Sequence, residues 1–161
     1  MAVDIFLKIA GVDGESEDSK HKNEIQVLSW SWGLSNTASA SVGAGAGSGK
    51  VNVQDLTVTK YVDKSTPKLL LASCNGSHFD DALLTVRKAG GQNPVEYLKI
   101  KLQKVFVSSV STGGQGSDDR VMETVSFNFG KVNVDYTPQT DKGAAGTAVT
   151  MGWDIPGNTK V

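Results

Sequence analysis

The chain has 161 residues, a net charge of −1, 39% hydrophobic residues and 20% charged residues. This length is typical of one domain, because two domains of half the size would each have a small core. The near-neutral charge excludes the strongly basic surface of a nucleic-acid-binding protein, and every apolar run is too short to span a membrane. We therefore expect one soluble domain that binds no nucleic acid and does not insert into a membrane.

The N-terminus and the cysteine content indicate the compartment. Asp4 and Lys8 interrupt the first apolar stretch and no basic segment precedes it, so a cleavable signal peptide is not expected. Cys74 is the single cysteine, which excludes an internal disulfide and a multi-cysteine metal site. We expect the protein to be made in the cytosol and to stay there, unless a machine that needs no cleavable signal exports it.

Alternation of apolar and polar residues dominates the chain and predicts an all-β, or mainly β, fold. In the first such segment Val3, Ile5, Leu7 and Ile9 alternate with the more polar residues between them. Strands are predicted over residues 3–10, 24–33, 50–61, 81–89, 95–110, 121–136 and 148–155.

Three of these strands change the phase of their alternation midway. In residues 24–33 the apolar side chains move from odd to even positions, at Ile25, Val27, Leu28, Trp30 and Trp32. Residues 50–61 change phase as well, and residues 121–136 do so across Gly130. A phase change indicates a bulge or a bend, and long bent strands are typical of a closed β-barrel or of two packed sheets. Burial of these strands on both faces is the alternative.

One short helix is predicted over residues 66–75. The hydroxyls of Ser65 and Thr66 suit the start of a helix, and Pro67 suits its first turn. Gly76 can take the left-handed conformation that ends a helix. A helix of about ten residues is unstable alone, so we expect it to flank the sheet and pack against it.

Residues 35–49 form an uncharged loop rich in Ser, Ala and Gly, with Val42 as its one sizeable apolar residue. Such a segment is flexible alone and becomes ordered only against a neighbouring surface. Its central residues are Ala40, Ser41, Val42, Gly43, Ala44, Gly45, Ala46 and Gly47. The loop therefore indicates either a protruding contact element or a flexible tip.

The motifs that suggest chemistry are incomplete. Gly49 and Lys50 resemble the end of a phosphate-binding loop, but Val51 replaces the hydroxyl residue and a strand follows in place of a helix. Residues 65–68 match the Ser-x-x-Lys motif of acylating serine enzymes, whose companion motifs are missing. The two histidines lie in separate polar loops without a recognisable set of metal ligands. We therefore expect no enzyme, no cofactor and no metal site.

Trp30 and Trp32 are the most distinctive residues of the chain. Alternation places both indoles on one face of a strand, where they anchor a core or an interface. Ser29 and Ser31 then face the opposite side.

A series of short motifs runs in order along nearly the whole chain. The series starts with residues 5–9 and continues through Gly14-Glu15-Ser16, Lys20-His21 and Glu24-Ile25 into residues 27–33. It goes on through residues 50–56, 59–61, 63–67, 84–91, 96–98 and 107–110, and it ends at Val134-Asp135-Tyr136 and Gly152-Trp153. This order of motifs resembles the Hcp (haemolysin-coregulated protein) family, the tube proteins of the bacterial type VI secretion system.

This resemblance implies a compact β-barrel with one flanking helix. It also implies that six subunits close into a ring and that rings stack into a tube. Such a tube forms inside a contractile sheath beneath a spike protein, is expelled from the bacterial cell when the sheath contracts, and carries small effector proteins in its lumen. Residues 40–47 are then candidates for contacts between stacked rings, and Ser29 and Ser31 are candidates for the lumen wall that contacts effectors.

Two other functions stay open at this point. One is a monomeric β-sandwich that binds a ligand or a peptide. The other is an enzyme, which would depend on Ser65 and Lys68.

Overall fold

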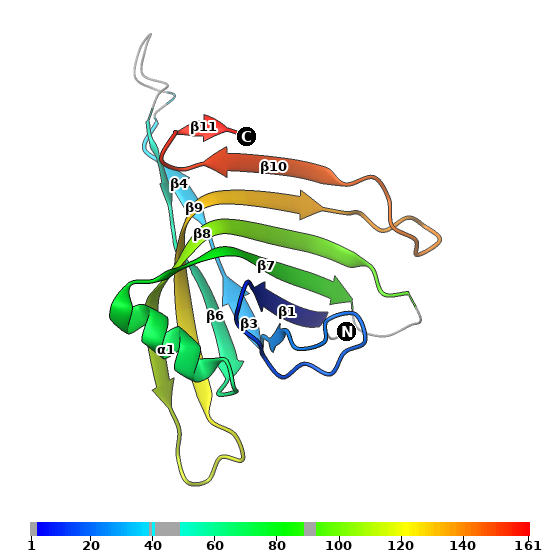
Figure 1. Ribbon diagram of the computed structural model, residues 1–161. Helices are drawn as coiled ribbons and strands as arrows, with labels where there is room; N and C mark the ends of the chain where they lie inside the picture. Colours follow the sequence, from blue (N-terminus) through cyan, green and yellow to red (C-terminus); the bar gives the residue numbers. More distant parts are fainter. Residues whose placement is uncertain (1–2, 39, 41–48, 89–92) are drawn as a thin grey trace.

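The computed structural model describes residues 3–38, 40, 49–88 and 93–161, and most of these residues form β-strands (Figure 1). The elements in chain order are β1 Val3–Ile9, β2 Ile25–Gln26, β3 Ser29–Ser31, β4 Leu34–Asn36, β5 Val51–Val53, β6 Leu56–Tyr61, α1 Thr66–Asn75, β7 His78–Lys88, β8 Glu96–Gly113, β9 Met122–Tyr136, β10 Val149–Asp154 and β11 Thr159–Lys160. The prediction of a mainly β fold with one short helix is confirmed.

The main sheet is antiparallel, and its order is β11-β10-β9-β8-β7-β1-β2. The N-terminal half of β8 and the C-terminal half of β9 lie beside β7 and β10 in an upper sheet, and the other halves of both strands turn downward in Figure 1. There β6 pairs with β9 and β3 pairs with β6. The chain between β2 and β3 connects β1 with β6. Val27 donates its backbone N–H to the backbone oxygen of Ile5 on β1, and Leu28 donates its N–H to that of Thr59 on β6. The result is two packed β-layers that share β8 and β9.

The phase change of β9 arises from a bend and not from an inserted residue. The pairing of β9 with β8 keeps its register past Gly130, with Val105 opposite Phe129 and Leu102 opposite Val132. Lys104 lies opposite Gly130 and has a left-handed φ of 55°. The register of β8 does shift further along, between Val107 and Ser109. The bend at Gly130 and the register shift in β8 together turn the β8–β9 pair from one layer into the other.

The predicted strands over residues 24–33 and 50–61 are each divided in two by the bends. One prediction within them was wrong: Leu28 does not face the core with Trp30 and Trp32 but is 42% exposed. The phase changes after Leu28, where the chain leaves β1 and begins to pair with β6. Trp30 and Trp32 both pack against the buried core, which is the first of the two roles, core or interface, that the sequence left open.

Helix α1 has the predicted bounds and ends at Gly76, whose φ of 67° is left-handed. The expected cap at its start is wrong, because the Ser65 side chain caps no backbone N–H of the helix. The Ser65 hydroxyl instead donates to the Asp63 carboxylate. Thr66 turns its hydroxyl inward, where it donates to Glu123 at 2.8 Å. Together with the buried side chain of Leu69, this bond attaches α1 to the core side of β9.

Candidate functional site

Ser29 and Ser31, the two predicted lumen residues, are both exposed on β3. Their neighbours across the sheet are also hydroxyl residues. Ser29 lies opposite Thr59 and Ser31 lies opposite Thr57 on β6. These cross-strand pairs continue onto β9 and then β8, which also carry hydroxyl residues at the paired positions. Eight hydroxyl side chains therefore share one face of four adjacent strands: Ser29, Ser31, Thr57, Thr59, Thr124, Ser126, Ser109 and Ser111. We call this surface the hydroxyl face.

The residues between these positions explain why the face exists. Trp30 pairs with Val58, and Val58 pairs with Val125, so the alternate positions of the same strands form the core. Helix α1 lies on that core side, because Thr66 and Leu69 contact it. The hydroxyl face therefore points away from α1.

The hydroxyl face is polar without fixed charge. The two oxygens Thr57 Oγ1 and Ser126 Oγ lie 2.9 Å apart and form a hydrogen bond within the face. At one end of the face, Asp55 accepts hydrogen bonds from Ser108 at 2.6 Å and from Asn128 at 3.0 Å. A hydroxyl can both donate and accept a hydrogen bond, so such a surface makes weak contacts with many partners. Because these contacts involve no charged groups, their strength changes little with salt concentration.

Sequence reasoning found two of these eight residues and missed six. The missed residues carry a signal, because each strand has hydroxyls at alternate positions, as in Thr57 and Thr59 or Thr124 and Ser126. The signal becomes a surface only when the strand order β3-β6-β9-β8 is known.

The proposed stacking residues lie mostly outside the described part of the chain. Ala40 is described and exposed, whereas Ser41, Val42, Gly43, Ala44, Gly45, Ala46 and Gly47 are not described. In the described part of the chain, the flanking strands β4 and β5 pair with each other and with no other strand, with Leu34 opposite Val53 and Asn36 opposite Val51. In Figure 1, β4 leads upward and away from the body of the molecule.

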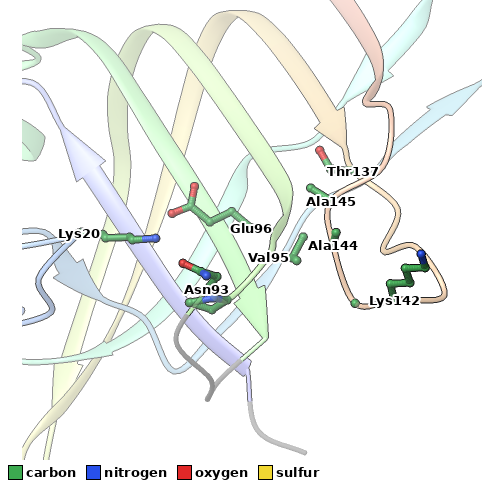
Figure 2. A pocket seen from close by; sticks show the side chains of 10 residues that line it. Lys20, Asn93, Val95, Glu96, Thr137, Lys142, Ala144 and Ala145 are labelled. Atoms are coloured by element: carbon green, nitrogen blue, oxygen red, sulfur yellow. The ribbon is translucent and has the colours of Figure 1, made fainter.

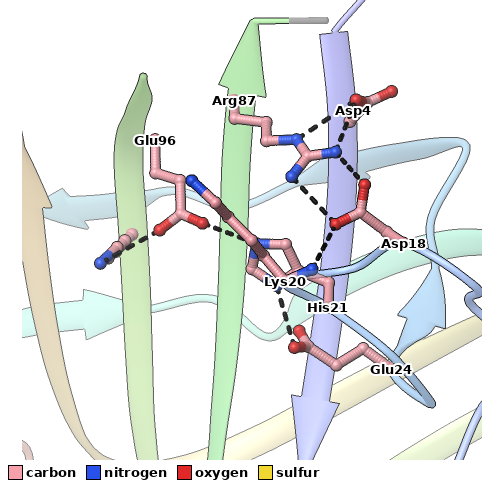
Figure 3. Close-up of polar contacts among 8 residues, drawn as sticks. Asp4, Asp18, Lys20, His21, Glu24, Arg87 and Glu96 are labelled. Carbon is pink, nitrogen blue, oxygen red and sulfur yellow. Dashed lines mark hydrogen bonds and ion pairs between the residues drawn. The ribbon is translucent and has the colours of Figure 1, made fainter. Parts of the chain in front are cut away.

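A polar cluster ties the loop after β1 to the sheet (Figure 3). His21 lies between two carboxylates, with Nδ1 2.9 Å from Glu24 and Nε2 2.6 Å from Glu96. Its ring stacks on Phe6, with 4.4 Å between the centroids. His21 is therefore a brace between this loop and β8.

Arg87 forms the second half of this cluster. Its guanidinium group binds Asp4 on β1 and Asp18 in the loop, and it lies 4.9 Å from the centre of the Phe6 ring. The hydrogen bond from Arg87 lowers the pKa of Asp18 from 3.8 to about 2. The bond from Asp18 in turn raises the pKa of Arg87.

The pKa of Glu96 is set by opposing effects. Burial acts to raise it, but the hydrogen bonds from His21 and Lys99 outweigh burial and hold the pKa of Glu96 below its ordinary value. The ionised carboxylate thus stays available to His21. The cluster as a whole is a structural clamp for the loop over residues 11–23.

A shallow hollow of about 730 Å³ lies beside this clamp. Figure 2 shows Lys20 and Glu96 on one side of it and Lys142 and Ala144 on the other. Its charged groups are of both signs and lie apart. In the parts of the chain that the structure describes, no group of three His, Cys, Asp or Glu side chains is placed to hold a metal ion.

The residues of the enzyme alternative do not form a catalytic pair. Ser65 is fully buried and donates its hydroxyl to Asp63. Lys68 is exposed and donates from Nζ to the backbone oxygen of Gly11 at 3.0 Å. Lys50 is followed directly by strand β5 and not by a helix.

The comparison with known proteins identifies the family. The model of the family described as "Type VI secretion system effector, Hcp" matches residues 6–136. The chain belongs to the Hcp family. It is also 60% identical to protein hcp1 of Pseudomonas aeruginosa over 161 residues, which cover 99% of each chain.

Solved Hcp structures share the fold. Hcp1 from Salmonella typhimurium is 39% identical, matches 100% of both chains and superposes with a TM-score of 0.83. A structure described as a type six secretion system protein is 35% identical and has a TM-score of 0.92, over 99% of this Hcp chain and 100% of its own. A type VI secretion system effector from Yersinia pestis is 34% identical with a TM-score of 0.77, over 94% of this Hcp chain and 100% of its own.

Membership makes this Hcp chain a tube protein of a type VI secretion system, which is a self-assembling structural component. Within the described residues, no helix is long and apolar enough to cross a membrane.

Proposed function

We propose that this Hcp chain forms hexameric rings that stack into a tube and carry small effector proteins in the lumen. Contraction of a sheath around the tube expels it together with a spike protein. The protein is made in the bacterial cytoplasm and leaves for the extracellular space or a target cell. The proposal treats residues 1–161 as one domain with no catalytic activity.

The hydroxyl face carries this proposal. It is a broad, uncharged and hydrogen-bonding surface on the side of the sheet that faces away from α1, and Ser29 and Ser31 lie at its edge on β3. A wall that holds varied effectors needs weak contacts of this kind, because strong charge would select one partner and reject others. We assign this face to the ring lumen.

The uncharged loop supports the stacking part of the proposal. In the sequence, residues 40–47 lie between β4 and β5, two strands that pair with each other and, among the described residues, with no strand of the main sheet. Small side chains let two backbones approach closely, and no charge has to lose its water on contact. We assign this loop to the contact between stacked rings.

Light scattering after gel filtration, combined with negative-stain microscopy, tests the proposal. The expected result is a particle of six times the subunit mass of 17.0 kDa with an open centre. A single globular species of one subunit mass would instead support a monomeric β-sandwich that binds a ligand or a peptide, and it would overturn the ring.

A further inference from the structure

One charged side chain lies at the end of the otherwise uncharged hydroxyl face. Asp55 directly precedes β6, and its alternation with Thr57 and Thr59 places its side chain on this face. Its carboxylate accepts hydrogen bonds from Ser108 on β8 and from Asn128 on β9. Because β9 lies between β6 and β8, the carboxylate lies over β9, on the side of the sheet that faces away from the core.

The backbone on both sides of Asp55 is fixed. Gln54 donates its N–H to the backbone oxygen of Gly33 at 3.0 Å, and its own oxygen accepts a hydrogen bond from the Trp32 indole at 2.9 Å. On the other side, Leu56 starts β6 and is fully buried. The carboxylate is therefore held through its backbone and at both of its oxygens, so it loses little freedom when it binds a partner.

The register shift in β8 brings Ser108 within reach of Asp55. Ser108 is the extra residue at this shift, between Val107 and Ser109, and it has no counterpart on β9. An extra residue in a strand redirects a side chain, and here the Ser108 hydroxyl reaches Asp55 at 2.6 Å. The irregularity that helps to turn β8 therefore also fixes the carboxylate of Asp55.

The negative charge of Asp55 is not compensated within the described residues. Both groups that donate to it are neutral, and no ion pair among these residues includes it. Asp18, by comparison, binds the guanidinium group of Arg87. A carboxylate can accept about four hydrogen bonds. The bonds that Asp55 accepts therefore leave room for a further, positively charged donor.

We propose that Asp55 is a cation-binding residue of the hydroxyl face and that it binds a lysine or arginine side chain of a carried effector. This proposal rests on the proposed function, which assigns the hydroxyl face to the ring lumen. A charge-assisted hydrogen bond to a fixed carboxylate is stronger than a bond between neutral groups. Each subunit thus offers one preferred contact among many weak ones, and the ring favours effectors with a basic surface.

The substitution Asp55→Asn tests the proposal, with Asp135→Asn as its matched control. Both aspartates are half-buried and both changes remove one negative charge, but Asp135 lies at the other end of β9, opposite Lys99 and Thr150. The probe is a fluorescent peptide of repeated Gly-Ser-Lys, and a peptide of repeated Gly-Ser-Glu carries the opposite charge. Fluorescence anisotropy at low salt should show that D55N binds the lysine peptide about fivefold more weakly than the parent, whereas D135N binds it like the parent.

Salt concentration and the glutamate peptide separate the outcomes. The parent should lose affinity for the lysine peptide as salt rises, because screening weakens a partly exposed charged contact, and D55N should change little. D55N should bind the glutamate peptide at least as well as the parent does, which a misfolded variant would not do. If D55N binds the lysine peptide like the parent, or if D135N is weakened as much, the assignment of Asp55 is overturned. Light scattering on the same samples distinguishes the two failures, since a parent protein without rings overturns the proposed function itself.

Discussion

Lys60 and Glu123 face each other across β6 and β9, with Nζ 2.5 Å from Oε2, and neither side chain is exposed. Asp63 lies 3.0 Å from the same Nζ, and Thr66 donates its hydroxyl to the same carboxylate. The pair therefore joins both strands to the start of α1 in the interior of the molecule.

Lys60→Met should destabilise the fold strongly, because it leaves the Glu123 carboxylate buried with one hydroxyl as its partner. The expected loss is about 3–5 kcal/mol of unfolding free energy. Denaturant unfolding at fixed protein concentration measures it. The double variant Lys60→Met/Glu123→Leu should recover part of the loss, since it removes the buried Glu123 carboxylate and leaves Asp63 with its hydrogen bonds from Ser65. A double variant as unstable as the single one would contradict this account.

Acid should release the clamp around Arg87. The pKa of Asp18 is about 2 in the folded protein, below its ordinary value of 3.8. The unfolded chain therefore binds a proton first, and the stabilising effect of Asp18 is complete above pH 4 and is lost as pH falls toward 2. Thermal unfolding between pH 5 and pH 2 measures this loss. Asp18→Asn should be less stable at pH 5 and should lose less on acidification. A parallel decline of both proteins would show that other groups cause the acid effect.

Ser31→Gln should leave rings intact and reduce the retention of effectors, because a longer amide side chain changes the shape of the hydroxyl face. Co-purification of a cognate effector with tagged rings measures the retention. Ser77→Gln is the control, since Ser77 is an exposed serine beyond the end of α1 and lies outside the hydroxyl face. Equal retention by both variants would remove Ser31 from the effector-contacting surface.

Deletion of residues 40–47 should weaken the stacking of rings and leave each ring assembled. The β4–β5 pair that carries the loop bonds only with itself, so the main sheet does not depend on it. Electron microscopy at high protein concentration measures the length of stacked particles. Stacks as long as those of the parent would show that the loop does not join rings.

The strands were largely predictable because alternation is a local property of the chain. The bends were visible as phase changes, but their mechanism was not. Gly130 marks a bend because the left-handed Lys104 lies opposite it, on a strand that is distant in the sequence. Likewise, the incorrect placement of Leu28 arose because the point at which the chain changes partners depends on β1 and β6.

The candidate surfaces were less predictable than the strands. Ser29 and Ser31 could be identified by their position opposite the tryptophans, but the other six hydroxyls join them only through strand order. Val149 and Met151 resemble core residues in the sequence, since they alternate as core residues do. Their exposure depends on what lies beside β10 in space. His21 could not be connected with Glu96, its partner 75 positions along the chain, from spacing alone.

The sharing of β8 and β9 between both layers has a mechanical consequence. One end of this strand pair carries part of the hydroxyl face, and the other end carries the exposed surface around Tyr136, beside β10. A force applied between these two surfaces is therefore transmitted along covalent backbones, and it does not shear one layer over the other. The two layers of this subunit are thus joined by two continuous strands, which share such a load between them.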